Sequence, residues 1–76
     1  HRLSTGEMEE IVSGHQAVAE CAVIGMADEL RGQVPLAFVV LKDGTKLSEE
    51  TIEHELVQLI REMIGAVACF RQVLVV

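Results

Sequence analysis

The chain has 76 residues, enough for one small domain that buries only about 60% of the surface its unfolded form exposes. Half of the residues are hydrophobic and 24% are charged, which is typical of an ordered globular domain. Six Lys and Arg against twelve Asp and Glu give a formal charge of −6, and only two residues are aromatic. Nucleic-acid binding is therefore not expected. No apolar stretch approaches the roughly 20 residues of a membrane-spanning helix, so no membrane association is expected either.

The first predicted helix begins at Thr5. Ser4 and Glu7 have the spacing of a capping box, in which each side chain accepts a hydrogen bond from the other residue's backbone N–H at the start of the helix. Gly14 is predicted to end the helix. The apolar face is expected to consist of positions that recur at helical spacing: Met8, Ile11, Val12 and His15.

Two apolar runs rich in β-branched residues predict the first two strands, at residues 18–26 and 34–41. The polar segment 27–32 between them is interpreted as a turn or a single helical turn. Pro35 lies in the second run and has no N–H to donate. That end of the strand is therefore expected at a sheet edge or a bulge.

The second predicted helix follows an Asp43-Gly44 turn and begins after Ser48, a favourable N-cap residue. It is expected to run to about residue 64, with Gly65 as its C-cap. Its apolar stripe consists of Ile52, Leu56, Leu59, Ile60 and Met63.

Residues 70–76 predict a third strand. The order α-β-β-α-β predicts a small α+β domain: a mostly antiparallel three-stranded sheet with helices packed on it and one crossover.

Few residues form a pattern that indicates catalysis. Glu9 with Glu10, and Glu49 with Glu50, are adjacent pairs whose side chains point about 100° apart on a helix, so we interpret them as solvated helix starts. His15 and His54 lack the Asp, Ser or Cys spacing of a nucleophilic triad. Phosphate-binding glycine motifs are absent, and no metal site is predicted. The cysteines, Cys21 and Cys69, are interpreted as small buried hydrophobic residues.

Two arginines are candidates for anion binding. Arg61 is the only cation on the second predicted helix, and no carboxylate lies three or four residues from it. It either complements the negative end of the helix dipole or binds a phosphate. Arg2 precedes a helix N-terminus, where free backbone N–H groups also favour anions. A plain surface charge remains the alternative for both.

A family resemblance is carried by four segments of the chain: 1–9, 18–25, 32–35 and 61–65. Together they resemble the C-terminal domain of the AMP-forming acyl-CoA synthetases. The resemblance covers essentially the whole chain, and the sequence is most similar to the acetyl- and propionyl-CoA synthetase branch. Gln16 and Ala66 depart from it where relatives commonly have proline, and Cys69 where they often have alanine.

The resemblance implies that this chain is the mobile lid of a two-step ligase. An N-terminal adenylation domain, expected in the same chain, would make an acyl-adenylate from ATP and a carboxylic acid, with Mg in the full enzyme. The lid would then rotate so that CoA forms the thioester. In this reading Arg2 approaches the nucleotide phosphates, His1 lies along the route of the CoA thiol arm, and Arg61 contacts the nucleotide end of CoA.

The resemblance also implies that residues 1–76 are a fragment of that lid domain. The family's catalytic lysine would lie beyond Val76 and the hinge before His1, so the fragment is expected to be inactive alone and to bind no cofactor. The location would be cytoplasmic, or the mitochondrial matrix in a eukaryote. Two alternatives stay open: a stand-alone regulatory or oligomerisation module, and the lid of a carrier-protein-loading adenylation enzyme.

Overall fold

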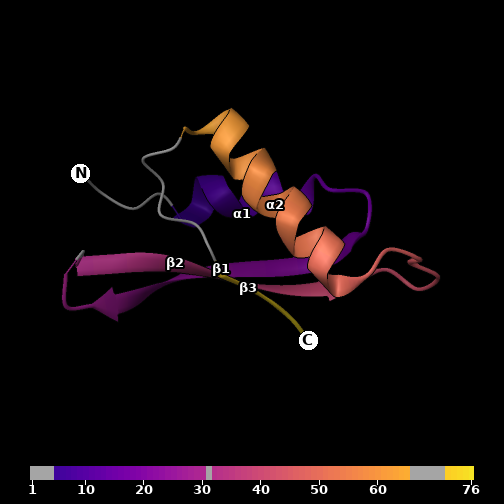
Figure 1. The fold of residues 1–76 in the computed structure, drawn as a ribbon, viewed down its shortest axis with the longest axis horizontal. Helices are drawn as coiled ribbons and strands as arrows, with labels where there is room; N and C mark the ends of the chain where they lie inside the picture. The colour runs from indigo at the N-terminus through magenta and orange to yellow at the C-terminus, as the bar shows by residue number, and fades with distance from the viewer. Residues whose placement is uncertain (1–4, 31, 66–71) are drawn as a thin grey trace.

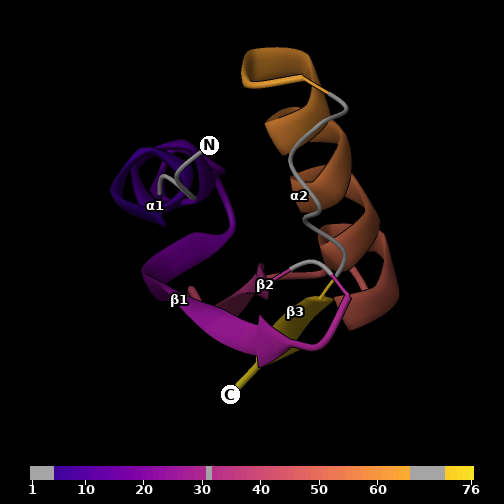
Figure 2. The same ribbon diagram turned by 90° about the vertical axis from the view of Figure 1, so that its left-hand side faces the viewer.

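The computed structural model describes residues 5–30, 32–65 and 72–76. The elements follow the predicted order: α1 (Thr5–Ser13), β1 (Val18–Asp28), β2 (Gly32–Leu41), α2 (Glu49–Met63) and β3 (Gln72–Val75). Both helices lie on the same side of the sheet (Figure 1). In the view of Figure 2, α1 lies over β1 and α2 lies over β3. The predicted α+β class is confirmed.

The sheet has the order β1-β2-β3, with β1 antiparallel and β3 parallel to the central β2. The antiparallel pair is the longer one, as predicted. In the register of this sheet, Ala37 lies opposite Val23 on β1 and Val73 on β3. Residues 70 and 71 of the predicted third strand lie outside the described residues.

Pro35 occupies a position where its missing N–H breaks no ladder hydrogen bond. It pairs with Gly25 of β1. Val23 lies two residues before Gly25, and its N–H donates to the side chain of Glu9 on α1. Because donors alternate along an antiparallel strand, Gly25 and Pro35 form a non-hydrogen-bonded pair. Pro35 also precedes Leu36, the first residue of β2 that pairs with β3. Pro35 nevertheless lies in the central strand, and the register shift between β1 and β2 lies at Val18/Glu20, so the expectation of a sheet edge or a bulge at Pro35 is wrong.

The hairpin between β1 and β2 is tighter than predicted. β1 continues to Asp28 and β2 begins at Gly32, with these two residues paired. The predicted turn at 27–32 was therefore too long, because cross-strand pairing extends the strands beyond the apolar runs.

The end of α1 follows the prediction, because the helix stops at Ser13, directly before Gly14. Gly14 itself does not have a positive φ. The N–H groups of Gly14 and His15 donate to the carbonyls of Ile11 and Val12, both at 3.1 Å. These are three-residue steps of the 3₁₀ type. His15 therefore lies beyond the helix and not on its apolar face.

The caps of α2 follow the prediction. The Ser48 side chain accepts a hydrogen bond from the Thr51 N–H at 3.1 Å. Ile64 forms the C-cap, with its N–H bound to the Ile60 carbonyl at 2.9 Å, and Gly65 follows with φ 115°. A positive φ at this position favours glycine.

The core lies between the helices and the sheet, where α2 contributes three side chains with no exposed surface, Ile52, Leu56 and Ile60. Strand alternation sends Ala37 and Val39 into this core. The alternate residues point to the opposite face, which carries partly exposed apolar side chains: Ile24, Met26, Val40 and Leu74.

Candidate functional site

Arg61 lies in the last turn of α2, with its side chain exposed. Within residues 5–30, 32–65 and 72–76, no ion pair involves it. Its position at the negative end of the helix dipole stabilises its charge, and no hydrogen bond to another described residue occupies its guanidinium donors. The planar fork of an arginine matches the oxygens of a phosphate group. The structure therefore presents Arg61 as an accessible cation on a rigid helix.

His1 and Arg2, the other two predicted contacts, lie outside the described residues. They precede α1 directly in the chain, since α1 begins at Thr5.

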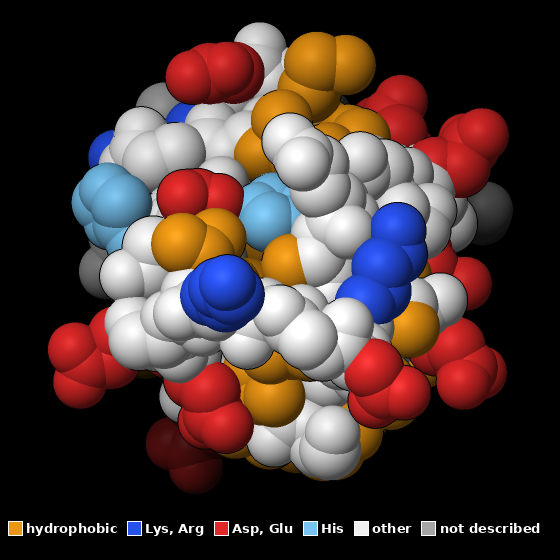
Figure 3. All heavy atoms as spheres, turned by 90° about the vertical axis from the view of Figure 1, so that its right-hand side faces the viewer, with side chains coloured by type: hydrophobic (Ala, Val, Ile, Leu, Met, Phe, Trp, Pro, Cys, Tyr) orange, Lys and Arg blue, Asp and Glu red, His pale blue; other side chains and the backbone are white. Residues whose placement is uncertain are grey.

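A shallow hollow opens at one end of the molecule, on the face seen in Figure 3. Three segments surround it: the turn after α1, the loop between β2 and α2, and the middle of α2. Figure 3 shows acidic, basic and histidine side chains gathered on this face. The lining residues are Gly14, His15, Gln16, Ala17, Lys42, Asp43, Gly44, Thr45, Lys46, Leu47, Glu55 and Leu59.

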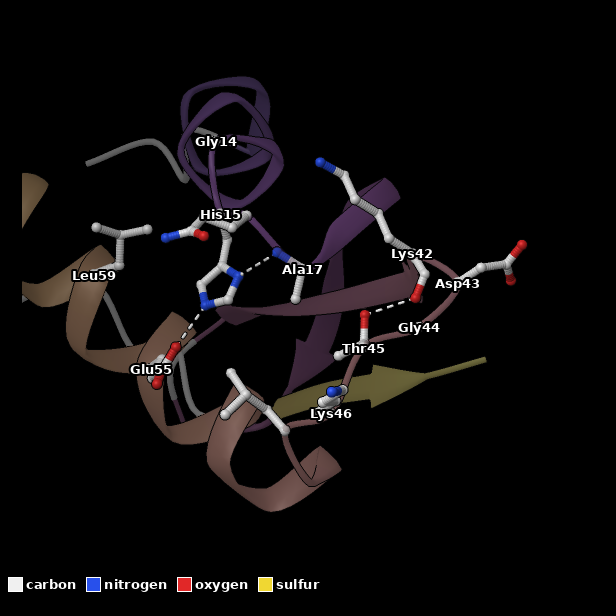
Figure 4. Close-up of a pocket in the computed structure, with 12 residues that line it drawn as sticks. Gly14, His15, Ala17, Lys42, Asp43, Gly44, Thr45, Lys46, Glu55 and Leu59 are labelled. Atoms are coloured by element: carbon white, nitrogen blue, oxygen red, sulfur yellow. Dashed lines mark hydrogen bonds and ion pairs between the residues drawn. The ribbon is translucent and has the colours of Figure 1, made fainter.

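His15 joins two sides of this hollow. Its Nε2 lies 2.6 Å from Oε1 of Glu55 on α2, and its Nδ1 accepts a hydrogen bond from the Ala17 N–H at 3.0 Å. The two bonds run in opposite directions from the ring (Figure 4). Because Nδ1 accepts this hydrogen bond, it carries no proton. Nε2 therefore carries the ring proton and donates a hydrogen bond to the Glu55 carboxylate. Both ring nitrogens are engaged, and neither is free to act as a general base.

The rim of the hollow is held by backbone hydrogen bonds. The Lys42 N–H donates to the Ala17 carbonyl at 2.8 Å, and the Thr45 hydroxyl donates to the Lys42 carbonyl at 2.6 Å. Asp43 points away from the His15 ring (Figure 4). The turn that carries His15 is therefore tied to the sheet as well as to α2.

Sequence reasoning missed the contact between His15 and Glu55. Forty residues separate the two in the chain, and no local spacing indicates such a pair. The assignment of His15 to an apolar helix face also hid it, and that assignment was wrong because α1 ends at Ser13.

Glu9 also differs from its interpretation as a solvated residue. Its Oε2 accepts a hydrogen bond from the Val23 N–H of β1 at 3.1 Å, and its backbone carbonyl accepts one from the Cys21 thiol at 3.4 Å. Glu10, next to it, is exposed as predicted. Glu9 therefore satisfies a donor on the outer edge of β1 that would otherwise be open to another strand.

Cys21 is half-buried between α1 and β1. Burial raises the pKa of its thiol above the ordinary 9.0, and the negative charge of Glu9 raises the pKa further. A raised pKa reduces the thiolate fraction, so Cys21 is a poor nucleophile. Cys69 lies outside the described residues.

The described part of the chain holds neither a cluster of metal ligands nor a membrane-spanning helix. No three His, Cys, Asp or Glu side chains come together there in a way that could hold a metal ion. Neither described helix combines the length and the apolar character that crossing a bilayer requires.

The comparison with protein families matches residues 7–76 to the AMP-binding enzyme C-terminal domain. An uncharacterized protein of Pseudomonas aeruginosa is 66% identical over the whole chain, which spans 12% of that protein. A mitochondrial protein of Dictyostelium discoideum, named acyl-CoA synthetase short-chain family member B, is 53% identical over 97% of the chain and 11% of its own length.

Among solved structures, an acyl-CoA synthetase of Brucella canis superposes with a TM-score of 0.86 and 32% identity, over the whole chain and 14% of that protein. The chain thus spans about a tenth of the length of the curated relatives it matches.

Proposed function

The chain belongs to the family of AMP-binding enzyme C-terminal domains, and we propose that it serves as the mobile C-terminal domain of a short-chain acyl-CoA synthetase. The reaction would convert a carboxylic acid, ATP and CoA into acyl-CoA, AMP and pyrophosphate. The relatives named short-chain acyl-CoA synthetases support the substrate class, and acetate or propionate is the proposed acid. The partner would be an adenylation domain in the same chain.

The observation that carries the proposal on this domain is the exposed Arg61 at the end of α2. CoA bears a phosphorylated nucleotide, and an arginine fork recognises phosphate through paired, charge-assisted hydrogen bonds. Arg61 would contact that nucleotide. Arg2 would approach the nucleotide phosphates, and His1 would lie along the route of the thiol arm.

The rest of the domain would serve as a rigid support. Three fully buried side chains of α2, Ile52, Leu56 and Ile60, anchor the helix on the sheet. A support of this kind keeps a ligand-binding group in place at small entropic cost when the ligand binds. Mg²⁺ would accompany ATP. Because the described residues offer no cluster of metal ligands, no step is assigned to the ion on this domain.

The location would be the cytoplasm, or the mitochondrial matrix in a eukaryote; the names of two relatives, which call those proteins mitochondrial, support a mitochondrial location.

The test uses the full-length synthetase that contains this segment. Acyl-CoA formation is measured with ATP, CoA and a series of acids of increasing chain length, and compared with a variant that lacks the domain. We expect highest kcat/KM for acetate or propionate and loss of acyl-CoA formation in the truncated variant. Transfer of the acyl group to a carrier protein in place of CoA would contradict the proposal, as would unchanged thioester formation without the domain.

A further inference from the structure

We propose that His15 and Glu55 form a positioning pair that fixes α2 against the turn after α1, and through α2 the position of Arg61. The inference rests on the proposed function, because it concerns the proposed CoA contact of Arg61. Neither His15 nor Glu55 would touch CoA. Their effect on the reaction would pass through Arg61.

The position of the pair in the fold is the first argument. His15 lies two residues after the end of α1, and Glu55 lies in the middle of α2. Arg61 follows Glu55 by six residues, about 9 Å along the helix axis. Because an α-helix of this length moves as a rigid rod, a restraint at Glu55 is passed on to Arg61.

The second argument is the direction of the contact. The other contacts between the helices are apolar, and Met8 and Val12 of α1 pack in the same core as Leu56 and Ile60. Apolar burial is non-directional and tolerates small shifts of one helix along another. The 2.6 Å hydrogen bond from His15 to Glu55 is directional and sets one alignment.

The third argument is that the histidine itself is held in place. The Ala17 N–H fixes the ring through Nδ1, and the Ala17 carbonyl is bound by the Lys42 N–H of the sheet. The His15 side chain is only 12% exposed, whereas Glu55 is 45% exposed. A partly exposed pair contributes little to overall stability, but a donor fixed in advance can still select one position of α2.

The test compares variants of the full-length synthetase. Glu55→Ala removes the acceptor, and His15→Asn keeps an acceptor for the Ala17 N–H but is too short to reach Glu55. We expect either change to raise the KM for CoA about threefold or more, with the KM for ATP unchanged. Glu55→Gln keeps an acceptor oxygen and should restore most of the loss. His54→Asn, on the exposed side of α2, is the matched control and should have no effect.

A double-mutant cycle with Arg61→Ala separates positioning from a general loss of stability. If the pair acts through Arg61, Glu55→Ala should change the KM for CoA by less than about 1.5-fold once Arg61 is absent. The same increase in both backgrounds would overturn the inference and leave the CoA contact of Arg61 intact. If Arg61→Ala itself leaves the KM for CoA unchanged, the proposed contact fails and the positioning role fails with it.

Discussion

Glu9 and Glu10 provide a test of the structure that needs no assumption about function. The two residues are adjacent on α1 and carry the same charge, but only Glu9 accepts the 3.1 Å hydrogen bond from the Val23 N–H. A hydrogen bond to a charged group contributes about 1.5–3 kcal/mol. Because Glu9 is only half-buried, we expect Glu9→Ala to lower the free energy of unfolding by about 1–2 kcal/mol. Glu10→Ala should stay within about 0.5 kcal/mol, as most surface substitutions do.

The assay is urea unfolding of the 76-residue chain, followed by circular dichroism. A domain of this size has a free energy of unfolding of about 4–11 kcal/mol. With an m-value of about 1 kcal/mol/M, Glu9→Ala should lower the urea midpoint by about 1–2 M. Glu9→Gln retains an acceptor oxygen and should fall between Glu9→Ala and the unaltered chain. Equal midpoints for Glu9→Ala and Glu10→Ala would refute the bond between α1 and β1.

Two further predictions concern the core and the thiol. Leu56→Ala should lower the free energy of unfolding by about 2–5 kcal/mol, because Leu56 has no exposed surface. Leu30→Ala should leave it nearly unchanged, because Leu30 is 93% exposed. Similar urea midpoints for the two variants would contradict this prediction. Alkylation of Cys21, followed by peptide mass spectrometry at pH 8, should be slower in the folded chain than in urea, because burial and Glu9 raise the pKa of the thiol. Since the folded state holds this proton more tightly, the contribution of Cys21 to stability is complete below about pH 9 and should be lost as the pH rises through the folded-state pKa. Equal alkylation rates in both states would be inconsistent with that environment.

Features that depend on neighbouring residues were predicted well from the sequence. The N-cap at Ser48 and the glycine after α2 are set within a few residues of the helix ends, and both are confirmed. The element order follows from hydrophobic periodicity, which reads one element at a time. The ends of the strands were predicted less accurately. The pairing of Asp28 with Gly32 depends on the partner strand and not on local hydrophobicity.

Contacts between elements could not be predicted in this way. The bond from Val23 to Glu9 joins residues 14 apart, and the bond from His15 to Glu55 joins residues 40 apart. Periodicity identified most of each apolar helix face, but Met63 is 66% exposed and His15 lies beyond the end of α1. It did not indicate which polar side chains meet between the helices. Arg61 was identified because its lack of a partner on its own helix is a local property. Its exposure and free guanidinium agree with that prediction, while contact with CoA stays a prediction.

The central claim, that Arg61 contacts the nucleotide end of CoA, is tested most directly by comparing CoA with pantetheine as thiol substrates of the full-length synthetase. Pantetheine carries the reactive thiol but lacks the nucleotide. We predict that Arg61→Ala raises the KM for CoA about tenfold, the equivalent of about 1.4 kcal/mol, and leaves the KM for pantetheine unchanged. An equal change for both thiols, or no change for either, would contradict the assignment of Arg61 to the CoA nucleotide.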